Sequence, residues 1–371
     1  MRVLSVQMRD FRTYARAEAQ LGPSLTVVHG PNGAGKSNLL EAIYFGCTAR
    51  SPRTRNEREL VRFGVSAMRV VVRVDDERQR HELSVGLQTR GEGRAEKVIA
   101  VDGAPLERPL ESEQRPLLSV FAPDRLELVK GAPALRRAHL DQFVSGLWPV
   151  RGAARREYAR VLAQRNALLG RVRTGSASSA TISAWDRELA RSALALSADR
   201  AAAVELLGGS FARQARQLGC QAELAVEYRP RSRAREEDEF VAELQARLRA
   251  DLERGYTGHG PHRDELAIVR EGRELRVFGS QGEQRLALLA LLLAERAALE
   301  QERRRLPLML LDDVMSELDS ERRELLAAEL SRDGQSVIAT TDLAHVPGAG
   351  EAHVTRLRVS PGTVLGEAVA A

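Results

Sequence analysis

The sequence predicts an α/β fold in which two distant segments build one nucleotide-binding lobe around an inserted, mostly helical lobe. Residues 30–37 read GPNGAGKS, the G-x-x-x-x-G-K-[ST] pattern of a loop that binds nucleotide phosphates. Residues 308–319 read LMLLDDVMSELD, which is typical of a buried strand that ends in two carboxylates. About 270 residues separate the two segments. One nucleotide site would therefore be assembled from both ends of the chain.

The first 120 residues have the pattern of strands and one helix. Alternating apolar and polar residues at the N-terminus predict a strand rather than a signal peptide. Ser24–Val28 predicts a short strand before the phosphate loop, and a helix is expected from Ser37. Alternating runs then predict an antiparallel meander between Ala67 and Val101, with strands at Met68–Val74, His81–Leu87 and Lys97–Val101.

Beyond Phe121 the pattern becomes helical. The expected helices are Ala134–Leu147, Arg151–Arg173, Thr181–Leu218 with a break at Gly208 and Gly209, and Glu236–Arg254. None of them sustains the long heptad repeat of a coiled-coil arm, so the insertion is expected to be compact. Strand patterns return after Gly260. We therefore expect a nucleotide-binding lobe of residues 1–120 and 256–371, with an inserted lobe of residues 121–255.

The phosphate loop carries the strongest chemical signal. Its glycines let backbone N–H groups converge on phosphate oxygens, and the following helix directs its positive end at the same anion. Lys36 is expected to contact the β- and γ-phosphates, and the Ser37 hydroxyl is expected to bind Mg²⁺. The predicted nucleotide-binding residues of the loop are Gly30, Pro31, Asn32, Gly33, Ala34, Gly35, Lys36 and Ser37.

Two adjacent acids follow the apolar strand at Leu308–Leu311. Asp312 can hold the water shell of Mg²⁺, and Asp313 can orient or deprotonate an attacking water. The alternative is a solvated turn after a strand. A core strand before the pair and the polar turn Ser316–Asp319 after it favour the functional interpretation.

A third element, Ser280–Arg285, opens a helix that is apolar on nearly every side. Ser280 and Gly282 at its N-terminus suit the binding of an anion. Taken alone, an ordinary helix cap explains Ser280 better. The interpretation as a nucleotide-binding turn depends on the presence of the phosphate loop and the paired acids in the same chain.

Composition permits several partners and excludes some classes of site. Of 371 residues only two are cysteines, Cys47 and Cys220, so neither a zinc cluster nor a disulfide framework is expected. The longest apolar run, Leu286–Ala294, is about half of a membrane span, so we expect a cytoplasmic protein without a membrane partner. The net charge is +5 with a pI near 9.6, carried almost entirely by arginine. Genomic base composition can explain the arginine, but nucleic acid is a permitted partner.

The order of the three motifs resembles that in the ABC-type ATPase heads of the SMC class, and most closely that in the RecF family. The motifs are GPNGAGKS, SQGEQR and LLLDDVMSELD. Further similar stretches run from the first strand to about Thr341. They are Phe11–Tyr14, Ser37–Ile43, Phe121–Asp124, Leu128–Gly131 and Gly258–Leu266. The resemblance implies an ABC/SMC-type head with a mixed sheet, an antiparallel meander and a helical insertion.

The resemblance also implies that ATP bridges two protomers. Gly30–Ser37, Asp312 and Asp313 of one protomer would bind ATP and Mg²⁺. Ser280 and Gly282 of the other would cap the γ-phosphate, with Asp319 in the turn that crosses the interface. Many ABC heads carry glutamate where this chain has Asp313, which is one methylene shorter, so a weak DNA-stimulated ATPase with slow turnover is expected, with Lys36 and Asp313 as its catalytic residues.

The function implied is DNA replication and recombinational repair. A dimer closed by ATP would bind DNA at gaps, where duplex adjoins single strand, and open after hydrolysis. By resemblance it would act with the mediators RecR and RecO in loading the RecA recombinase and support the SOS response. One alternative is the ATPase subunit of a membrane transporter, which the helical insertion and the paired aspartates disfavour. Another is a stand-alone P-loop enzyme, which would have no use for the turn at Ser280–Arg285.

Arginine clusters are the candidate DNA contacts. They are Arg50, Arg53, Arg55, Arg58 and Arg62; Arg151, Arg155, Arg156 and Arg160; and Arg231, Arg233 and Arg235. A solvated face is the usual explanation for any one of them. Aromatic residues make up 4% of the chain. We therefore expect contacts to duplex backbone rather than base stacking on single strands.

Overall fold

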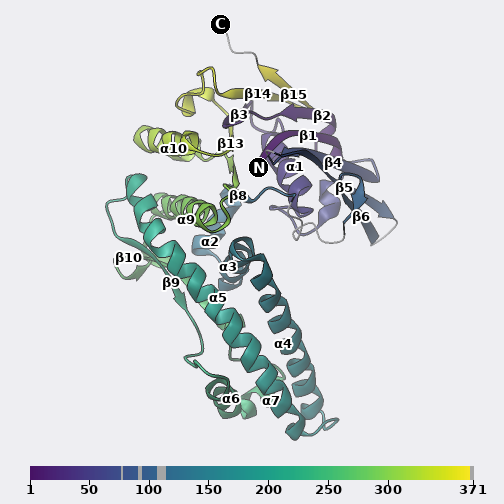
Figure 1. Cartoon of the computed structure of the whole chain (residues 1–371), viewed down its shortest axis with the longest axis vertical. Coiled ribbons are helices and arrows are strands. Elements are labelled where there is room, and N and C mark those ends of the chain that lie inside the picture. The colour runs from purple at the N-terminus through teal and green to yellow at the C-terminus, as the bar shows by residue number, and fades with distance from the viewer. Residues whose placement is uncertain (77, 91–93, 107–113, 368–371) are drawn as a thin grey trace. The chain divides into compact units, whose positions relative to one another are not determined.

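The computed structural model describes residues 1–76, 78–90, 94–106 and 114–367 (Figure 1). Contacts divide it into two compact units. The first unit contains residues 1–125, 217–219 and 299–371, and the second contains residues 126–216 and 220–298.

A mixed sheet of six strands forms the nucleotide-binding half of the first unit, in the order β15-β14-β3-β13-β12-β8. Its strands are β3 (Leu25–His29), β8 (Leu118–Phe121), β12 (Leu308–Asp312), β13 (Ser336–Thr340), β14 (Thr355–Ser360) and β15 (Thr363–Glu367). Only the β14–β15 pairing is antiparallel. Figure 1 shows the purple β3 among yellow-green C-terminal strands, so both ends of the chain share this sheet, as predicted.

The second sheet of this unit is the predicted antiparallel meander, in the order β2-β1-β4-β5-β6-β7. Its strands are β1 (Arg2–Phe11), β2 (Tyr14–Gln20), β4 (Ala67–Asp75), β5 (Arg80–Arg90), β6 (Arg94–Val101) and β7 (Ala104–Pro105). Every second residue of β4 from Met68 to Val74 is buried. Those side chains pack with α1 (Lys36–Thr48) in one core, because a strand presents alternate residues to one face. The unit also contains α10 (Ser320–Arg332).

Gln335 ties the two sheets of this unit together. It is buried, its side-chain oxygen accepts from the Val3 N–H at 2.8 Å, and its amide donates to the carbonyls of Val3 and Gly22, each at 2.7 Å. The start of β1 is therefore fixed beside the start of β13, which helps to place the strand ends that carry the site.

Helices dominate the second unit. They are α2 (Glu127–Lys130), α3 (Pro133–Leu147), α4 (Gly152–Arg173), α5 (Ile182–Gln217), α6 (Glu237–Ala246), α7 (Leu248–Arg254), α8 (Leu275–Phe278) and α9 (Gln281–Arg303). The unit also holds a three-stranded antiparallel sheet; strands after Gly260 were predicted, whereas the strand at Leu224–Arg229, between two predicted helices, was not. Its order is β11-β10-β9, with β9 (Leu224–Arg229), β10 (Glu265–Arg270) and β11 (Arg273–Glu274).

Two of the predicted helix boundaries are wrong. The break at Gly208 and Gly209 does not occur, because α5 continues through both. Buried Leu207 and Phe211 anchor the helix on either side, and that packing outweighs a glycine cost of about 1 kcal/mol each. The predicted helix Glu236–Arg254 is two helices that meet at Arg247, whose φ of −108° and ψ of 0° are not helical.

The compact units divide the chain differently from the predicted lobes of residues 121–255 and of 1–120 with 256–371. Residues 256–298 cluster with the helical unit. Part of the reason is a pair of buried arginines that bind Asp264 and Glu265 to two helices. Arg200 of α5 pairs with Asp264 at 3.3 Å, and Arg136 of α3 pairs with Glu265 at 2.7 Å. β10 then pairs with β9 along six residues.

Candidate nucleotide-binding site

The phosphate loop joins the end of β3 to the start of α1 and requires glycine at two positions. Gly30 has φ +151°, and a Cβ there would lie 2.2 Å from the carbonyl oxygen of Val359. Gly35 caps α1 with φ +116°, and its carbonyl accepts from the Tyr14 hydroxyl at 2.9 Å. Side chains rarely adopt such backbone angles. The loop is thus held by its own conformation and by β2 before any ligand binds.

Lys36 folds back over this loop. Its ammonium donates to the carbonyls of Gly30 at 2.8 Å and of Pro31 at 3.0 Å. Burial lowers the pKa of Lys36, while the charges of Asp313 and Asp312 act in the opposite direction. The lysine therefore lies in the field of two predicted site carboxylates, Asp312 for Mg²⁺ and Asp313 for catalysis.

Ser37 and Asp312 meet although 275 residues separate them. The Ser37 hydroxyl donates to Asp312 Oδ1 at 3.0 Å. Burial raises the pKa of Asp312, and the hydrogen bond from Ser37 opposes that shift. The contact forms because β3 and β12 flank β13 in parallel, so that their carboxyl ends lie at one edge of the sheet. This is the meeting of distant segments that the sequence predicts.

Asp313 has an unusual conformation for a residue with a side chain. Its φ is +53°, its N–H donates to Ala339 O at 3.0 Å, and its Oδ1 is buried without a hydrogen-bond partner. Aspartate tolerates left-handed backbone better than most residues. An unpaired buried carboxylate oxygen is rare and calls for a ligand or water. These features of Asp313 argue against the alternative that the two acids form a solvated turn.

These groups fit a nucleotide with Mg²⁺. Within the described ranges no group of three or more His, Cys, Asp or Glu side chains could hold a metal ion. Mg²⁺ commonly binds one or two protein oxygens and completes its shell with water and substrate phosphates. Ser37 and Asp312 supply that kind of incomplete oxygen set, and the loop above them supplies backbone donors for phosphate.

The turn at Ser280 belongs to the second unit and is a capping box, the local structure that the sequence favours when this segment is taken alone. The Ser280 hydroxyl accepts from the Glu283 N–H at 3.3 Å, and Glu283 Oε2 accepts from the Ser280 N–H at 2.8 Å. The hydrogen bond from that N–H is the main reason why the pKa of Glu283 is lowered. The S-x-x-E spacing could have revealed this box from sequence.

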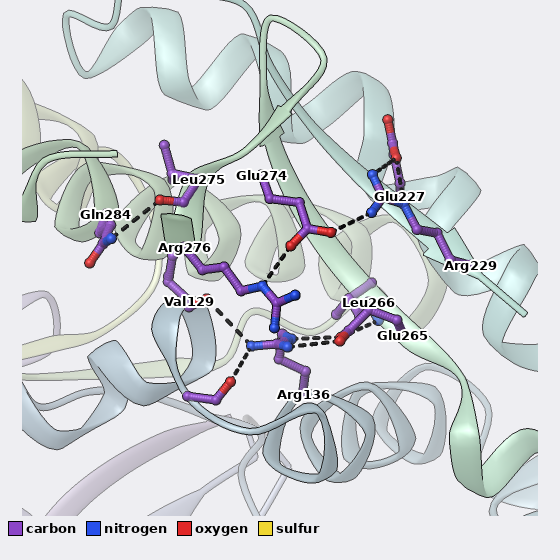
Figure 2. A network of polar contacts seen from close by, with 11 residues as sticks. Val129, Arg136, Glu227, Arg229, Glu265, Leu266, Glu274, Leu275, Arg276 and Gln284 are labelled. Atoms are coloured by element: carbon purple, nitrogen blue, oxygen red, sulfur yellow. Dashed lines mark hydrogen bonds and ion pairs between the residues drawn. The ribbon is translucent and has the colours of Figure 1, made fainter. Parts of the chain in front are cut away.

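A second layer of contacts holds the Ser280 turn. The buried Gln284 side chain donates to the carbonyls of Leu275 and Gly279, each at 3.2 Å. Figure 2 shows this amide directed at Leu275, and Glu274 accepting from Arg276 at 2.6 Å and Arg229 at 2.7 Å. The start of α9 is therefore fixed by side chains that sequence reasoning did not single out. Gly282 has open space around it.

Asp319 lies in the first unit and caps α10. Its carboxylate accepts from the Arg322 N–H at 2.9 Å and pairs with the Arg322 side chain at 3.2 Å. Its side chain is more than half exposed. The structure thus gives Asp319 a local role and leaves it accessible.

Several candidate DNA-binding arginines are used within the fold. Arg53 pairs with the buried Glu41 at 3.4 Å, and Arg62 pairs with Asp10 at 2.8 Å. In the second cluster Arg155 pairs with Asp141 at 3.2 Å and Arg160 with Glu157 at 2.6 Å. The exposed side chains of the third cluster form no ion pair within the described part of the chain; they are Arg231, Arg233 and Arg235.

The mixed sheet, the meander and the phosphate loop beside Asp312 define the fold of an ABC-type ATPase head of the SMC class. A family model described as the RecF/RecN/SMC N terminal domain matches residues 2–357. The DNA replication and repair protein RecF of Myxococcus xanthus (strain DK1622) is 36% identical over 378 residues, covering 98% of this chain and 97% of that protein. Its counterpart in Anaeromyxobacter sp. (strain Fw109-5) is 38% identical over 362 residues, covering 94% and 95%. The chain belongs to the RecF family.

Solved structures agree with this assignment. A recombination mediator protein RecF-ATP structure in the RecFOR pathway superposes with a TM-score of 0.86 at 28% identity, covering 99% of this chain and 97% of that one. An SMC head bound to the C-winged helix domain of ScpA has a TM-score of 0.60 at 15% identity, a likeness of fold alone. The predicted fold class and family are confirmed. In the described part of the chain no helix has the length and apolar character needed to cross a membrane.

Proposed function

We propose that this chain is an ATP-dependent DNA-binding protein of DNA replication and recombinational repair, which dimerises around ATP on DNA. The contact between Ser37 and Asp312 carries the proposal, because it brings the end of the predicted phosphate loop to the predicted Mg²⁺-binding aspartate near the other end of the chain. The unpaired Oδ1 of Asp313 beside it supports a bound water or ligand. The curated relatives are named for DNA replication and repair, and one solved relative is described with ATP.

Within one protomer the phosphate loop would bind ATP. Backbone N–H groups of Gly30–Ser37 and the Lys36 ammonium would contact the phosphates, while Ser37 and Asp312 would hold Mg²⁺. A bound Mg²⁺ ion would neutralise part of the phosphate charge. Asp313 would then accept a hydrogen bond from the attacking water and orient it.

The second protomer would complete this site. The start of α9 offers backbone N–H groups and the Ser280 hydroxyl to an anion, and Gly282 has no side chain to block close approach. Asp319 is accessible in the turn that would cross the interface. ATP would thus bridge two copies of the chain, and loss of the γ-phosphate would let them separate.

Replacement of Ser280 with arginine tests the dimer. We expect the wild-type chain to change from the mass of a monomer to that of a dimer when ATP and Mg²⁺ are added, and Ser280→Arg to remain a monomer that still binds ATP. The reason is that a bulky side chain would occupy the space of the γ-phosphate. Light scattering coupled to size exclusion gives the mass. Gln245→Arg, an exposed position of α6, adds the same side chain to the same unit and should dimerise normally. A dimer of Ser280→Arg would contradict the model.

Replacement of Asp313 with asparagine tests the chemistry. We expect the single-turnover rate of ATP hydrolysis to fall by about 100-fold or more, because the group that orients the water loses its charge. Asparagine tolerates the left-handed backbone at this position, so the loop should keep its shape. ATP binding and dimer formation should persist, and the dimer should last longer. An unchanged hydrolysis rate would remove Asp313 from the reaction.

Membership of the RecF family supports a proposal for the role on DNA. We propose binding to duplex next to a gap, a weak DNA-stimulated ATPase that times opening, and action with RecR and RecO in loading the recombinase and supporting the SOS response. Binding should weaken steeply with salt, because phosphate contacts release counterions. A titration of blunt duplex, gapped duplex and single strand at several salt concentrations, with and without ATP, measures the preference. Equal affinity with and without ATP would contradict an ATP-controlled switch.

A further inference from the structure

Three arginines form one row across the outer face of the antiparallel sheet. Arg9 of β1 is directly opposite Arg16 of β2 and Arg69 of β4. All three are exposed, while the alternating residues Met8 and Val70 point into the core. Because adjacent strands lie about 5 Å apart, the row spans roughly 10 Å. We call Arg9, Arg16 and Arg69 the arginine row.

The positive charge of the arginine row is not balanced by nearby acidic side chains in the described part of the chain. Among the described residues no carboxylate lies within ion-pair distance of any of its members, and the one hydrogen bond recorded for them joins Arg69 to the Ser84 hydroxyl at 3.4 Å. Like charges directly opposite each other on a sheet are destabilising. The fold gains nothing visible from this arrangement, whereas an anionic ligand would relieve it.

The next residue along the same cross-strand line is Gly86 of β5, which pairs with Arg69. A Cβ at Gly86 would meet only the carbonyl oxygens of Met68 at 3.8 Å and Val98 at 3.9 Å, so a side chain would fit there without a clash. Glycine weakens a strand interior and often marks a close approach by a ligand or another backbone. The surface beside Arg69 is therefore low and accessible.

An exposed aromatic residue lies at the end of this face. Phe63 is 98% exposed, in a loop of residues 62–66 that we call the Phe63 loop. The Arg62 N–H donates to Asp10 O, and Arg62 Nε donates to Asp10 Oδ1, both at 2.8 Å. At the other end of the loop, Ser66 O accepts from the Thr89 N–H at 2.7 Å and from its hydroxyl at 3.0 Å. Asp10 directly follows Arg9, so the loop is fixed beside the arginine row.

We propose that the arginine row binds DNA phosphates while Phe63 stacks on an exposed base where duplex meets single strand. Every base has a face that an aromatic ring can cover, and the charges next to the ring suit the backbone of the same strand. The inference rests on the proposed DNA-binding function and departs from the expectation that base stacking on single strands is poor. That expectation overlooked Phe63, which directly follows Arg62 and which the fold leaves in solvent. A protein partner would need a matching set of acidic side chains to bind the same three arginines, whereas every DNA backbone supplies phosphates.

The test compares DNA substrates in a chain altered at Phe63. A gapped duplex carries 2-aminopurine as the first unpaired base, and a blunt duplex of equal length serves as reference. With the wild-type chain we expect quenching of 2-aminopurine fluorescence and tighter binding of the gapped substrate. Phe63→Ala should lower affinity for the gapped substrate by about 10-fold, abolish the quenching and leave blunt-duplex affinity within about twofold. Phe63→Tyr should retain both signals.

Controls separate this contact from general effects. Leu365→Ala removes another exposed apolar side chain of the first unit and should change neither signal. Arg9→Gln with Arg69→Gln should weaken both substrates alike and reduce the salt slope by about two. Unchanged affinity and quenching in Phe63→Ala would overturn the stacking role. The role would also be overturned if Phe63→Ala lost binding to a partner protein while its DNA binding stayed the same. If the wild-type chain binds gapped DNA equally with and without ATP, the proposed switch fails, while the comparison at Phe63 still stands.

Discussion

Replacing Lys36 with alanine is expected to lower the affinity for ATP by at least about 100-fold, which corresponds to about 2.7 kcal/mol. In the structure the Lys36 ammonium already lies over the phosphate loop, 2.8 Å from Gly30 O, and in the field of Asp312 and Asp313. Alanine removes the cation that would pair with the phosphates. It also leaves both carboxylates to repel the same phosphates, so two unfavourable effects add.

Calorimetric titration with ATP and Mg²⁺ measures this loss. Lys130→Ala is the matched control, because Lys130 is an exposed lysine whose ion pair with Glu127 is long, at 3.9 Å. We expect that control to bind ATP as the wild type does. The Lys36→Ala chain should melt at a similar temperature without nucleotide and should lose the ATP-dependent increase in DNA affinity. Retention of ATP binding within tenfold would show that residues 30–37 do not form the nucleotide site.

Local patterns were sufficient for the parts of the site that lie within one element. The phosphate loop is encoded in eight consecutive residues, and the apolar run at Leu308–Leu311 predicts a strand buried on both faces. Their contact could also be predicted, because parallel strands bring their carboxyl ends to one edge. The observed hydrogen bond from Ser37 to Asp312 is the result.

Features that depend on distant partners were not predictable. The left-handed backbone of Asp313 is set by its N–H bond to Ala339, which no local pattern announces. The arginine row exists only once the registers of β2, β1 and β4 are known. Continuity of α5 through Gly208 and Gly209 depends on packing of Leu207 and Phe211, and packing overrides propensity. At Ser280 the cap was readable, and its role between protomers stays a prediction.

The loop that precedes β10 shows most clearly how polar sequence can be buried. Thr257–Asp264 is rich in polar residues, but it contacts Arg165 of α4, which has 0% exposure. Arg165 Nε donates to Asp186 at 2.8 Å, and Nη1 donates to Asp251 at 2.9 Å and to Thr257 at 2.7 Å. One guanidinium therefore joins helices α5 and α7 to the loop that leads toward α9.

Replacing Arg165 with methionine is expected to destabilise the second unit by about 3–5 kcal/mol, because the change leaves Asp186 and Asp251 buried without a countercharge. In a unit of this size the midpoint of thermal unfolding should fall by roughly 10 °C. Scanning calorimetry or circular dichroism measures it. Arg249→Met is the control, since that arginine is 94% exposed in its pair with Glu253 and should shift the midpoint little.

A further variant can show whether the lower stability of Arg165→Met comes from the unpaired carboxylates or from lost packing. Methionine has a long apolar side chain that fills much of the arginine's space, so the expected penalty comes chiefly from two desolvated carboxylates. If this is correct, adding Asp186→Asn and Asp251→Asn to Arg165→Met should restore a substantial part of the lost midpoint temperature. The reason is that neutral amides cost less to bury than unpaired charges. If the triple variant melts at or below the single variant, the guanidinium acts mainly through its shape and its bond to Thr257. In that case the loop before β10, rather than the charge of the core, sets the stability of the unit.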